Sequence, residues 1–222
     1  MPTRLRPTAP IASDAILVGD PGRALLLAQE LLGQPKMSNH ARGLWGYSGT
    51  TPAGCGLTIQ STGMGGPSAA LVLGELAGLG VRRAIRVGTC TAFDACVGLG
   101  DLLIASEAVA RGGSASSFGL ELGESATPDP SLTEALEAAL AGQSSLRVVA
   151  SFDALPESRE RGPGEAAGDM QTAPLLASAR LLGLHVAALL IVAEASGAML
   201  DKDDLEQAER RAGRAARTVL ST

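Results

Sequence analysis

The segment Ile85-Arg86-Val87-Gly88-Thr89-Cys90-Thr91 places an arginine inside an apolar strand and follows it at once with a Gly-Thr turn. A strand interior rarely holds a charged side chain unless a fixed counter-charge meets it. The small residues that follow leave backbone N–H groups and a hydroxyl free to face the same ligand. This pattern is typical of a site that grips an oxyanion, above all phosphate. A solvated edge-strand arginine or a buried structural ion pair is the alternative.

A turn near the N-terminus carries similar chemistry. Gly19-Asp20-Pro21-Gly22-Arg23 follows a short apolar strand, with Asp20 suited to the N-cap of a helix and Pro21 to its first position. Gly19 lets a ligand approach the backbone. Arg23 falls in the first helical turn, where its charge opposes the helix dipole unless an anion is bound. A solvated arginine is the simpler alternative here.

Two further segments are rich in glycine and polar residues and are candidates for the same site. Arg42 lies within residues 39–49, a stretch rich in glycine and polar residues. Ser61-Thr62-Gly63-Met64-Gly65-Gly66-Pro67-Ser68 follows another predicted strand and opens a helix at Pro67. Glycine-rich strand-to-helix turns bind anions or sugar oxygens through their backbone N–H groups. The spacing matches neither the G-x-G-x-x-G fingerprint nor the P-loop.

Short apolar strands alternate with helical segments along the chain, which predicts a mixed sheet with helices on both faces. The predicted strands are 15–18, 57–61, 84–87, 101–105, 147–151 and 186–192. The predicted helices are 21–32, 67–79, 131–141, 172–182 and 201–220. Residues 112–130 are predicted to form a loose Gly/Ser-rich loop. We find no internal repeat and no linker, and therefore expect residues 1–222 to form a single domain.

In order and spacing, these segments resemble the trimeric and hexameric nucleoside phosphorylases, the family that holds bacterial purine nucleoside phosphorylase and uridine phosphorylase. The matching strings are Gly19-Asp20-Pro21-Gly22-Arg23, Arg42-Gly43, residues 61–68 and Arg86-Val87-Gly88-Thr89, with weaker matches at Gly100-Asp101-Leu102-Leu103-Ile104 and Asp169-Met170. They cover the chain from about residue 10 to about residue 195. The resemblance implies an α/β fold of one domain with three α/β/α layers around a mixed central sheet.

The resemblance also implies an activity and a set of site residues. The activity is phosphate-dependent cleavage of the N-glycosidic bond of a purine or uridine-like nucleoside, which gives the free base and (deoxy)ribose 1-phosphate. Inorganic phosphate is the co-substrate, and no metal or other cofactor is expected. Residues assigned to phosphate are Gly19, Arg23, Arg42, Arg86, Gly88 and Thr89. Residues assigned to the nucleoside are Met64, Thr91, Phe152, Arg159, Arg161, Asp169, Met170 and Gln171. Arg42 would reach the phosphate of a neighbouring subunit, so the site would require self-association.

The chain departs from the family at its sugar-binding positions. Many relatives carry an N-terminal Thr-Pro-His-Ile, whose histidine reaches the ribose 5′-hydroxyl, but here Pro10 stands at the histidine position. The two histidines, His40 and His185, are expected to be structural. Gln171 replaces a glutamate that binds the ribose hydroxyls in the family. Its amide can accept and donate hydrogen bonds, but it lacks the charge that strengthens them. We therefore expect weaker ribose binding or a changed sugar.

The base-binding positions leave purine and pyrimidine open. Purine enzymes carry an aspartate after a late strand to protonate the leaving base; here Glu194 is the candidate general acid, if burial raises its pKa. A solvated carboxylate is the alternative. Uridine enzymes read uracil with a glutamine and an arginine, and Arg159 and Arg161 stand at these positions. Arginine only donates hydrogen bonds, so Arg161 favours a pyrimidine whereas Arg159 does not fit a standard uracil pocket.

Composition narrows the function class. The chain has 222 residues, 45% of them hydrophobic and 2% aromatic, which suits one large α/β domain. A net charge of −5 argues against a nucleic-acid partner. The three cysteines include no C-x-x-C pair and predict neither a disulfide framework nor a zinc site, which fits the cytoplasm. We find no signal-peptide core and no apolar run of membrane-spanning length, so no membrane partner is expected.

Three other functions compete with the phosphorylase. A nucleosidase of the same superfamily would use water in place of phosphate, but it has no use for three phosphate arginines. A non-catalytic paralogue that binds nucleoside or phosphate would explain why Pro10, Gln171 and Glu194 depart from the family while the phosphate positions are intact. An unrelated dinucleotide-binding protein lacks support, because no acidic residue follows a G-x-G-x-x-G at the required distance.

Overall fold

The computed structural model describes residues 4–154 and 161–222. The strands are β1 (Asp14–Val18), β2 (Gly33–Asn39), β3 (Gly46–Thr50), β4 (Gly56–Ser61), β5 (Arg83–Ala92), β6 (Leu102–Ala110), β7 (Ser125–Ala126), β8 (Ser144–Ser151), β9 (Glu165–Asp169), β10 (His185–Ala195) and β11 (Ala198–Met199). The α-helices are α1 (Pro21–Leu31), α2 (Gly66–Gly78), α3 (Pro130–Leu140), α4 (Thr172–Leu182) and α5 (Lys202–Leu220), and the 3-10 helices are η1 (Ala41–Gly43) and η2 (Gly113–Phe118).

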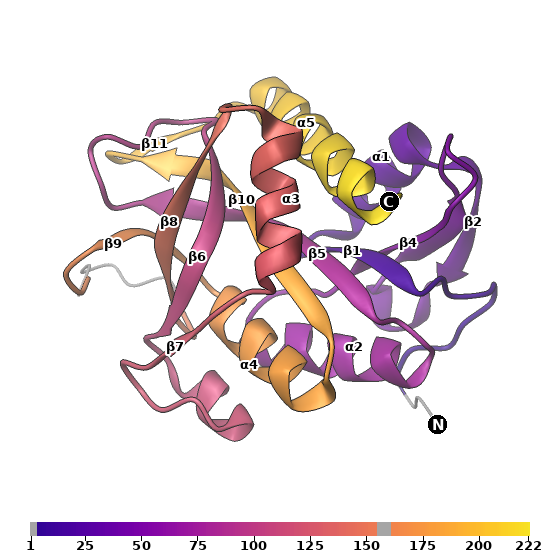
Figure 1. The fold of residues 1–222 in the computed structure, drawn as a ribbon, viewed down its shortest axis with the longest axis horizontal. Helices are drawn as coiled ribbons and strands as arrows, with labels where there is room; N and C mark the ends of the chain where they lie inside the picture. Colours follow the sequence, from indigo (N-terminus) through magenta and orange to yellow (C-terminus); the bar gives the residue numbers. More distant parts are fainter. Residues whose placement is uncertain (1–3, 155–160) are drawn as a thin grey trace.

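The strands form one mixed sheet in the order β11-β10-β6-β8-β9-β5-β1-β4-β3-β2, in which β10 also pairs with β5. This second pairing closes β5, β9, β8, β6 and β10 into a barrel, and β1, β4, β3 and β2 extend from it as an open sheet (Figure 1). β5 is the strand common to both parts. It runs parallel to β1 on one side and to β10 on the other. The predicted mixed sheet is confirmed.

Helices cover both faces of the sheet, as the sequence predicted (Figure 1). Because side chains alternate along a strand, Ile16 and Val18 of β1 pack in the cluster beneath α1, α3 and α5, whereas Ala15 and Leu17 pack in the cluster beneath α2 and α4. A smaller cluster fills the barrel, with Leu103 among its buried residues. β5 contributes buried residues to all three clusters and so lies at the centre of the molecule.

Every predicted helix is present, with ends within one residue of the prediction, and every predicted strand is present. The predicted turn at Gly88-Thr89 is wrong, because β5 continues to Ala92 through its pairing with β10. β2 was missed since it is polar, largely exposed and carries Pro35, as befits the edge of a sheet. The predicted loop over 112–130 contains η2 and β7.

Neither a membrane-spanning helix nor a metal-binding cluster occurs among residues 4–154 and 161–222. No helix there is both long and apolar enough to cross a bilayer. No three of the His, Cys, Asp and Glu side chains in these ranges are grouped so that they could hold a metal ion.

Candidate functional site

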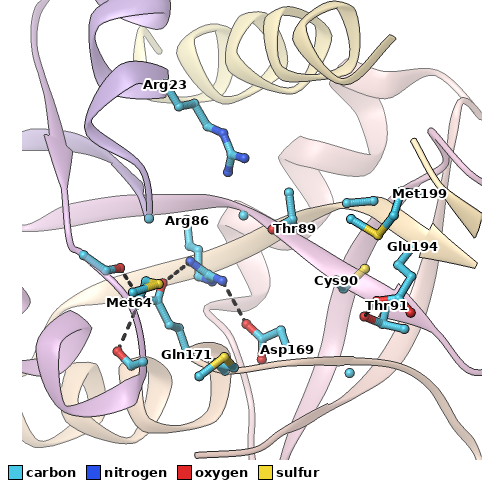
Figure 2. Close-up of a pocket in the computed structure, with 17 residues that line it drawn as sticks. Arg23, Met64, Arg86, Thr89, Cys90, Thr91, Asp169, Gln171, Glu194 and Met199 are labelled. Atoms are coloured by element: carbon cyan, nitrogen blue, oxygen red, sulfur yellow. Dashed lines mark hydrogen bonds and ion pairs between the residues drawn. The ribbon is translucent and has the colours of Figure 1, made fainter. Parts of the chain in front are cut away.

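A cavity of about 240 Å³ lies where the carboxyl ends of β1, β4 and β10 meet the second half of β5. Ligand sites of α/β proteins are commonly found at this edge of the sheet. Its lining brings together eleven of the residues predicted from the sequence: Gly19, Arg23, Met64, Arg86, Gly88, Thr89, Thr91, Asp169, Met170, Gln171 and Glu194. Figure 2 shows Arg23 and Arg86 at one end of the cavity, and Thr91, Glu194 and Met199 at the other.

Arg86 is the central cation of the site, and only 5% of its surface is exposed. Its Nη2 donates to Asp169 Oδ2 at 2.9 Å, its Nη1 to Gln171 Oε1 at 2.5 Å and its Nε to Thr172 Oγ1 at 3.3 Å. A guanidinium has five N–H groups, so one on each terminal nitrogen is left over. Arg86 is therefore both a member of a buried ion pair and a two-donor site for a ligand.

Gly88 makes room for the Arg86 side chain. A Cβ atom at position 88 would lie 2.5 Å from Arg86 Nη2 and 2.6 Å from its Cζ. Real Cβ atoms do not approach other atoms this closely, so a larger residue would displace the guanidinium. The Arg86 side chain packs closely against the backbone at position 88. This packing explains why position 88 is a glycine although it lies within a continuous strand.

Arg23 lies beside Arg86, on the first turn of α1. The side chain of Asp20 caps this helix by accepting a hydrogen bond from the Arg23 backbone N–H at 2.8 Å. The Arg23 guanidinium donates from Nε to Glu209 Oε1 at 2.6 Å and from Nη1 to the Val87 carbonyl at 3.4 Å. Arg23 also lines the cavity. Burial lowers the pKa of Arg86, Asp169 opposes that shift, and the nearby positive charge of Arg23 adds to it.

Asp169 and Gln171 lie at the end of the cavity that contains Arg23 and Arg86. Asp169 accepts from Ser151 Oγ at 2.5 Å and from the backbone N–H and hydroxyl of Thr172, in addition to Arg86. The hydrogen-bond donors that surround the carboxylate offset the free-energy cost of burying its charge. Gln171 Nε2 donates to the carbonyls of Gly63 and Gly65 at 2.7 and 3.2 Å. Gln171 thus joins Arg86 to the glycine-rich turn between β4 and α2.

The amide of Gln171 is already engaged in this network. Both Nε2 hydrogens have carbonyl partners, and Oε1 accepts from Arg86 and from Thr62 Oγ1. Sequence reasoning assigned the side chain to the ribose hydroxyls, and that assignment stays a prediction. The observed contacts give Gln171 a structural role, because it links Arg86 to the carbonyls of Gly63 and Gly65.

A Gln171→Glu variant is expected to unfold more easily, by about 1–3 kcal/mol, because a carboxylate cannot donate and would leave the two glycine carbonyls without their donor. Urea unfolding of the two proteins measures the difference. Gln207→Glu, an exposed change of the same type on α5, is the control and is expected to have little effect. Equal or higher stability of Gln171→Glu would contradict the role inferred from these contacts.

The far end of the cavity contains Thr91 and Glu194. Thr91 Oγ1 donates to Glu194 Oε2 at 3.1 Å. The β10–β5 register shifts between Val192 and Glu194, and such a bulge re-aims the side chains that follow it. Glu194 consequently stands opposite Thr91. Between the two ends, Cys90 is buried, and burial raises the pKa of its thiol, so that the thiol stays protonated at neutral pH.

Of the predicted residues that the structure describes, three do not line this cavity: Arg42, Phe152 and Arg161. Arg42 is exposed on η1, with φ of 60°, and lines a separate groove beside α2. Phe152 is buried and its ring meets that of Phe93 edge to face at a centroid distance of 6.2 Å. Arg161 donates to the carbonyl of Phe93. Arg159 lies outside the described residues.

Sequence reasoning missed three partners in this network. Thr172 and Glu209 accept hydrogen bonds from Arg86 and Arg23, which lie 86 and 186 residues away. Ser151 donates to Asp169, 18 residues away. The position of Glu209 could have been recognised from the sequence. It stands next to Ala208 and three residues before Ala212, on the buried face of α5, where an isolated carboxylate requires a counter-charge.

Comparison with known proteins establishes the family. A sequence model of the phosphorylase superfamily matches residues 13–222. The chain belongs to this superfamily. The resemblance noted in the sequence is thereby confirmed.

Two of the sequence relatives are named DeoD-type purine nucleoside phosphorylase. The DeoD-type purine nucleoside phosphorylase of Oceanobacillus iheyensis is 41% identical over 99 residues, which are 44% of this chain and 42% of that protein. The enzyme of the same name from Clostridium beijerinckii is 40% identical over 103 residues, 46% of this chain and 43% of that protein. The matches thus span less than half the length of these relatives.

The crystal structure of uridine phosphorylase from Vibrio fischeri ES114 superimposes with a TM-score of 0.84 at 26% identity, covering 95% of this chain and 92% of that one. The predicted fold class is therefore confirmed. The sequence relatives and the structural neighbour are named for different bases, so the comparisons themselves do not choose between purine and pyrimidine.

Proposed function

We propose that this protein is a nucleoside phosphorylase, which cleaves the N-glycosidic bond of a nucleoside with inorganic phosphate. The observation that carries the proposal is the pair Arg23 and Arg86: two buried guanidinium groups in one cavity, each fixed by a buried carboxylate and each with N–H groups to spare. Two adjacent cations with outward donors suit a dianion such as phosphate. The names of the sequence relatives and of the structural neighbour agree with this activity.

In the proposed reaction, a phosphate oxygen supplies the electron pair for a new bond to C1′. The electron pair of the broken C1′–N bond leaves with the base, which takes up a proton. Arg23 and Arg86 orient the phosphate beneath C1′, assisted by Gly19, Gly88 and Thr89. The negative charge of phosphate also stabilises the oxocarbenium-like sugar of the transition state. Met64 and Met170 are proposed to pack against the sugar. No metal or other cofactor is required.

The leaving base is proposed to occupy the end with Thr91 and Glu194. Glu194 lines the cavity there and supplies a carboxyl group that can protonate a ring nitrogen of a purine. Arg161 is the corresponding candidate for a pyrimidine, together with Arg159 and Phe152, but its contact is with Phe93. The placement of Glu194 favours a purine as the preferred base.

We further propose that the protein self-associates and that the Arg42 of one copy completes the phosphate site of its neighbour. Arg42 is exposed and stands outside the cavity of its own chain, which leaves it available to a second copy. The proposed partners of the protein are nucleosides and inorganic phosphate. Its proposed location is the cytoplasm.

The proposed function predicts base release that depends on phosphate. Uridine, thymidine, inosine, adenosine and methylthioadenosine are incubated with the protein, each with and without phosphate, and the free base is measured. Release only with phosphate is the expected result, with inosine or adenosine preferred if Glu194 acts as the acid. Release without phosphate would instead indicate a nucleosidase. Phosphate binding without any release would indicate a non-catalytic binding protein.

A further inference from the structure

The carboxylate of Glu209 is an unusual feature of α5. The buried face of this helix is otherwise formed by small and apolar residues, among them Ala208, Ala212 and Ala216. Glu209 is nonetheless only 8% exposed. Burying a carboxylate is costly unless a partner compensates it, and here that partner is Arg23, with 2.6 Å between Nε and Oε1.

Arg23 stands between two hollows of the molecule. On one side is the cavity that holds Arg86; on the other is a crevice between α1 and α5, lined by Asp20, Lys202 and Glu206 among others. The carboxylates of Asp20 and Glu206 line this crevice and would compete for the Arg23 guanidinium if its side chain turned toward them. Something must therefore hold the guanidinium toward the cavity, because a long side chain has many rotamers to choose from.

Two contacts hold it there. Glu209 accepts from Nε, and the carbonyl of Val87 on β5 accepts from Nη1. Because a guanidinium is planar, contacts at two of its nitrogens also fix the direction of the third, Nη2. Figure 2 shows the Arg23 guanidinium extended from α1 toward β5, on the side of Arg86 and Thr89. Because Arg23 lines the cavity with Arg86, the donors that remain are available to the phosphate proposed to bind there.

We propose that Glu209 is a positioning residue of the phosphate site, whose carboxylate holds Arg23 in its anion-binding orientation and so makes the C-terminal helix part of that site. This inference rests on the proposed function, since it assumes that phosphate is the anion between Arg23 and Arg86. Glu209 itself does not line the cavity and needs no contact with the substrate. Its effect acts through Arg23 alone.

The test separates position from charge. Glu209→Ala removes the acceptor and frees Arg23 to turn to the crevice, and the KM for phosphate is expected to rise at least about tenfold, the loss typical of one hydrogen bond to a charged group. Glu209→Gln keeps an acceptor oxygen at the same position and removes a negative charge. Its phosphate KM is expected to stay within about threefold of the wild type, or to fall. The KM for the nucleoside is expected to change little in both variants.

Glu30 provides the matched control. It joins α1 to α5 through Arg210 and Arg214, both at 2.7 Å, yet it does not line the cavity. Glu30→Gln weakens the same helix pair without touching Arg23, and it is expected to leave the phosphate KM unchanged. An equal rise of phosphate KM in Glu30→Gln and Glu209→Ala would overturn the proposal, because the effect would then come from helix packing.

Direct phosphate binding, measured by calorimetry without nucleoside, separates this inference from the proposed function. If the wild type binds phosphate and folded Glu209→Ala binds it equally well, the positioning role is wrong whatever the catalytic result. If the wild type binds no phosphate, the proposed function fails, and this inference fails with it. Glu209→Asp, which keeps the charge on a shorter side chain, serves if the alanine variant does not fold; weaker phosphate binding is expected, and wild-type binding would overturn the proposal.

Discussion

Arg86→Ala is expected to lower phosphate-dependent turnover by about 10²–10³-fold or more, the loss typical when one preorganised donor is removed from a developing or bound anion. The variant loses both N–H groups that Arg86 can offer to the ligand. It also loses the cation that, with Arg23, matches the charge of a dianion. Steady-state kinetics at varied phosphate concentration measure the effect, which should appear chiefly in kcat/KM for phosphate.

The same substitution also threatens the fold, because Asp169 would keep a buried charge without its cation. Removing one partner of a buried ion pair typically costs about 3–5 kcal/mol. Arg86→Lys is therefore the informative companion. Its ammonium still compensates Asp169, but a single nitrogen cannot serve Asp169, Gln171 and phosphate together in the planar arrangement of a guanidinium. We expect a folded protein that is still at least about tenfold impaired.

Circular dichroism and thermal unfolding establish whether each variant is folded before its kinetics are compared. A folded Arg86→Lys or Arg86→Ala protein with wild-type phosphate kinetics would show that the central cation of the cavity does not bind phosphate. The proposed function would then lose the observation on which it rests.

The sequence was sufficient to predict that Arg23 and Arg86 share one cavity, because each is a cation at a position where a cation is unusual. Arg86 is a charge in an apolar strand, and Arg23 is a cation at the positive end of a helix. Each anomaly is visible within a few residues. The alternation of apolar strands and helices likewise predicted the helix ends and the mixed sheet, since periodicity is a local property.

The contacts that hold the site together could not be predicted in this way, because they are long-range. Glu209 is 186 residues from Arg23, and Gln171 is 85 residues from Arg86. Only the fold brings them together. The closed barrel was missed for a related reason: β9 is a short strand of small and charged residues, and its pairing with β5 is not encoded in any periodic pattern.

The segment Gly88-Thr89 illustrates how residues that line one cavity can be predicted from an incorrect local structure. Glycine after an arginine suggested a turn, since turns commonly contain glycine. Instead β5 continues, and Gly88 is required by the side chain two residues earlier in the same strand. Arg86, Gly88 and Thr89 still line one cavity in the continuous strand, and their assignment to phosphate stays a prediction.

Gly88→Ala tests this explanation and is expected to lower kcat/KM for phosphate by about 10²-fold, close to the effect of losing the Arg86 donors. The backbone at Gly88 does not have the positive φ that would exclude alanine, so conformational strain is not the cause. The cause is the methyl group, whose carbon would lie 2.5 Å from Arg86 Nη2 and 3.0 Å from Nη1. The guanidinium must move, and each of its hydrogen bonds to Asp169, Gln171 and Thr172 then weakens.

Gly74→Ala is the matched control, because a Cβ at this helical position has no heavy atom within 4 Å. It is expected to leave phosphate kinetics unchanged and to stabilise α2 by about 0.5–1 kcal/mol, since alanine is the better helix former. Gly88→Ala should instead lower the melting temperature, because the buried Asp169 loses much of its compensation. A Gly88→Ala enzyme with wild-type phosphate kinetics would mean that Arg86 can leave its observed position without cost. The buried network around it would then be a structural ion pair and not a phosphate site.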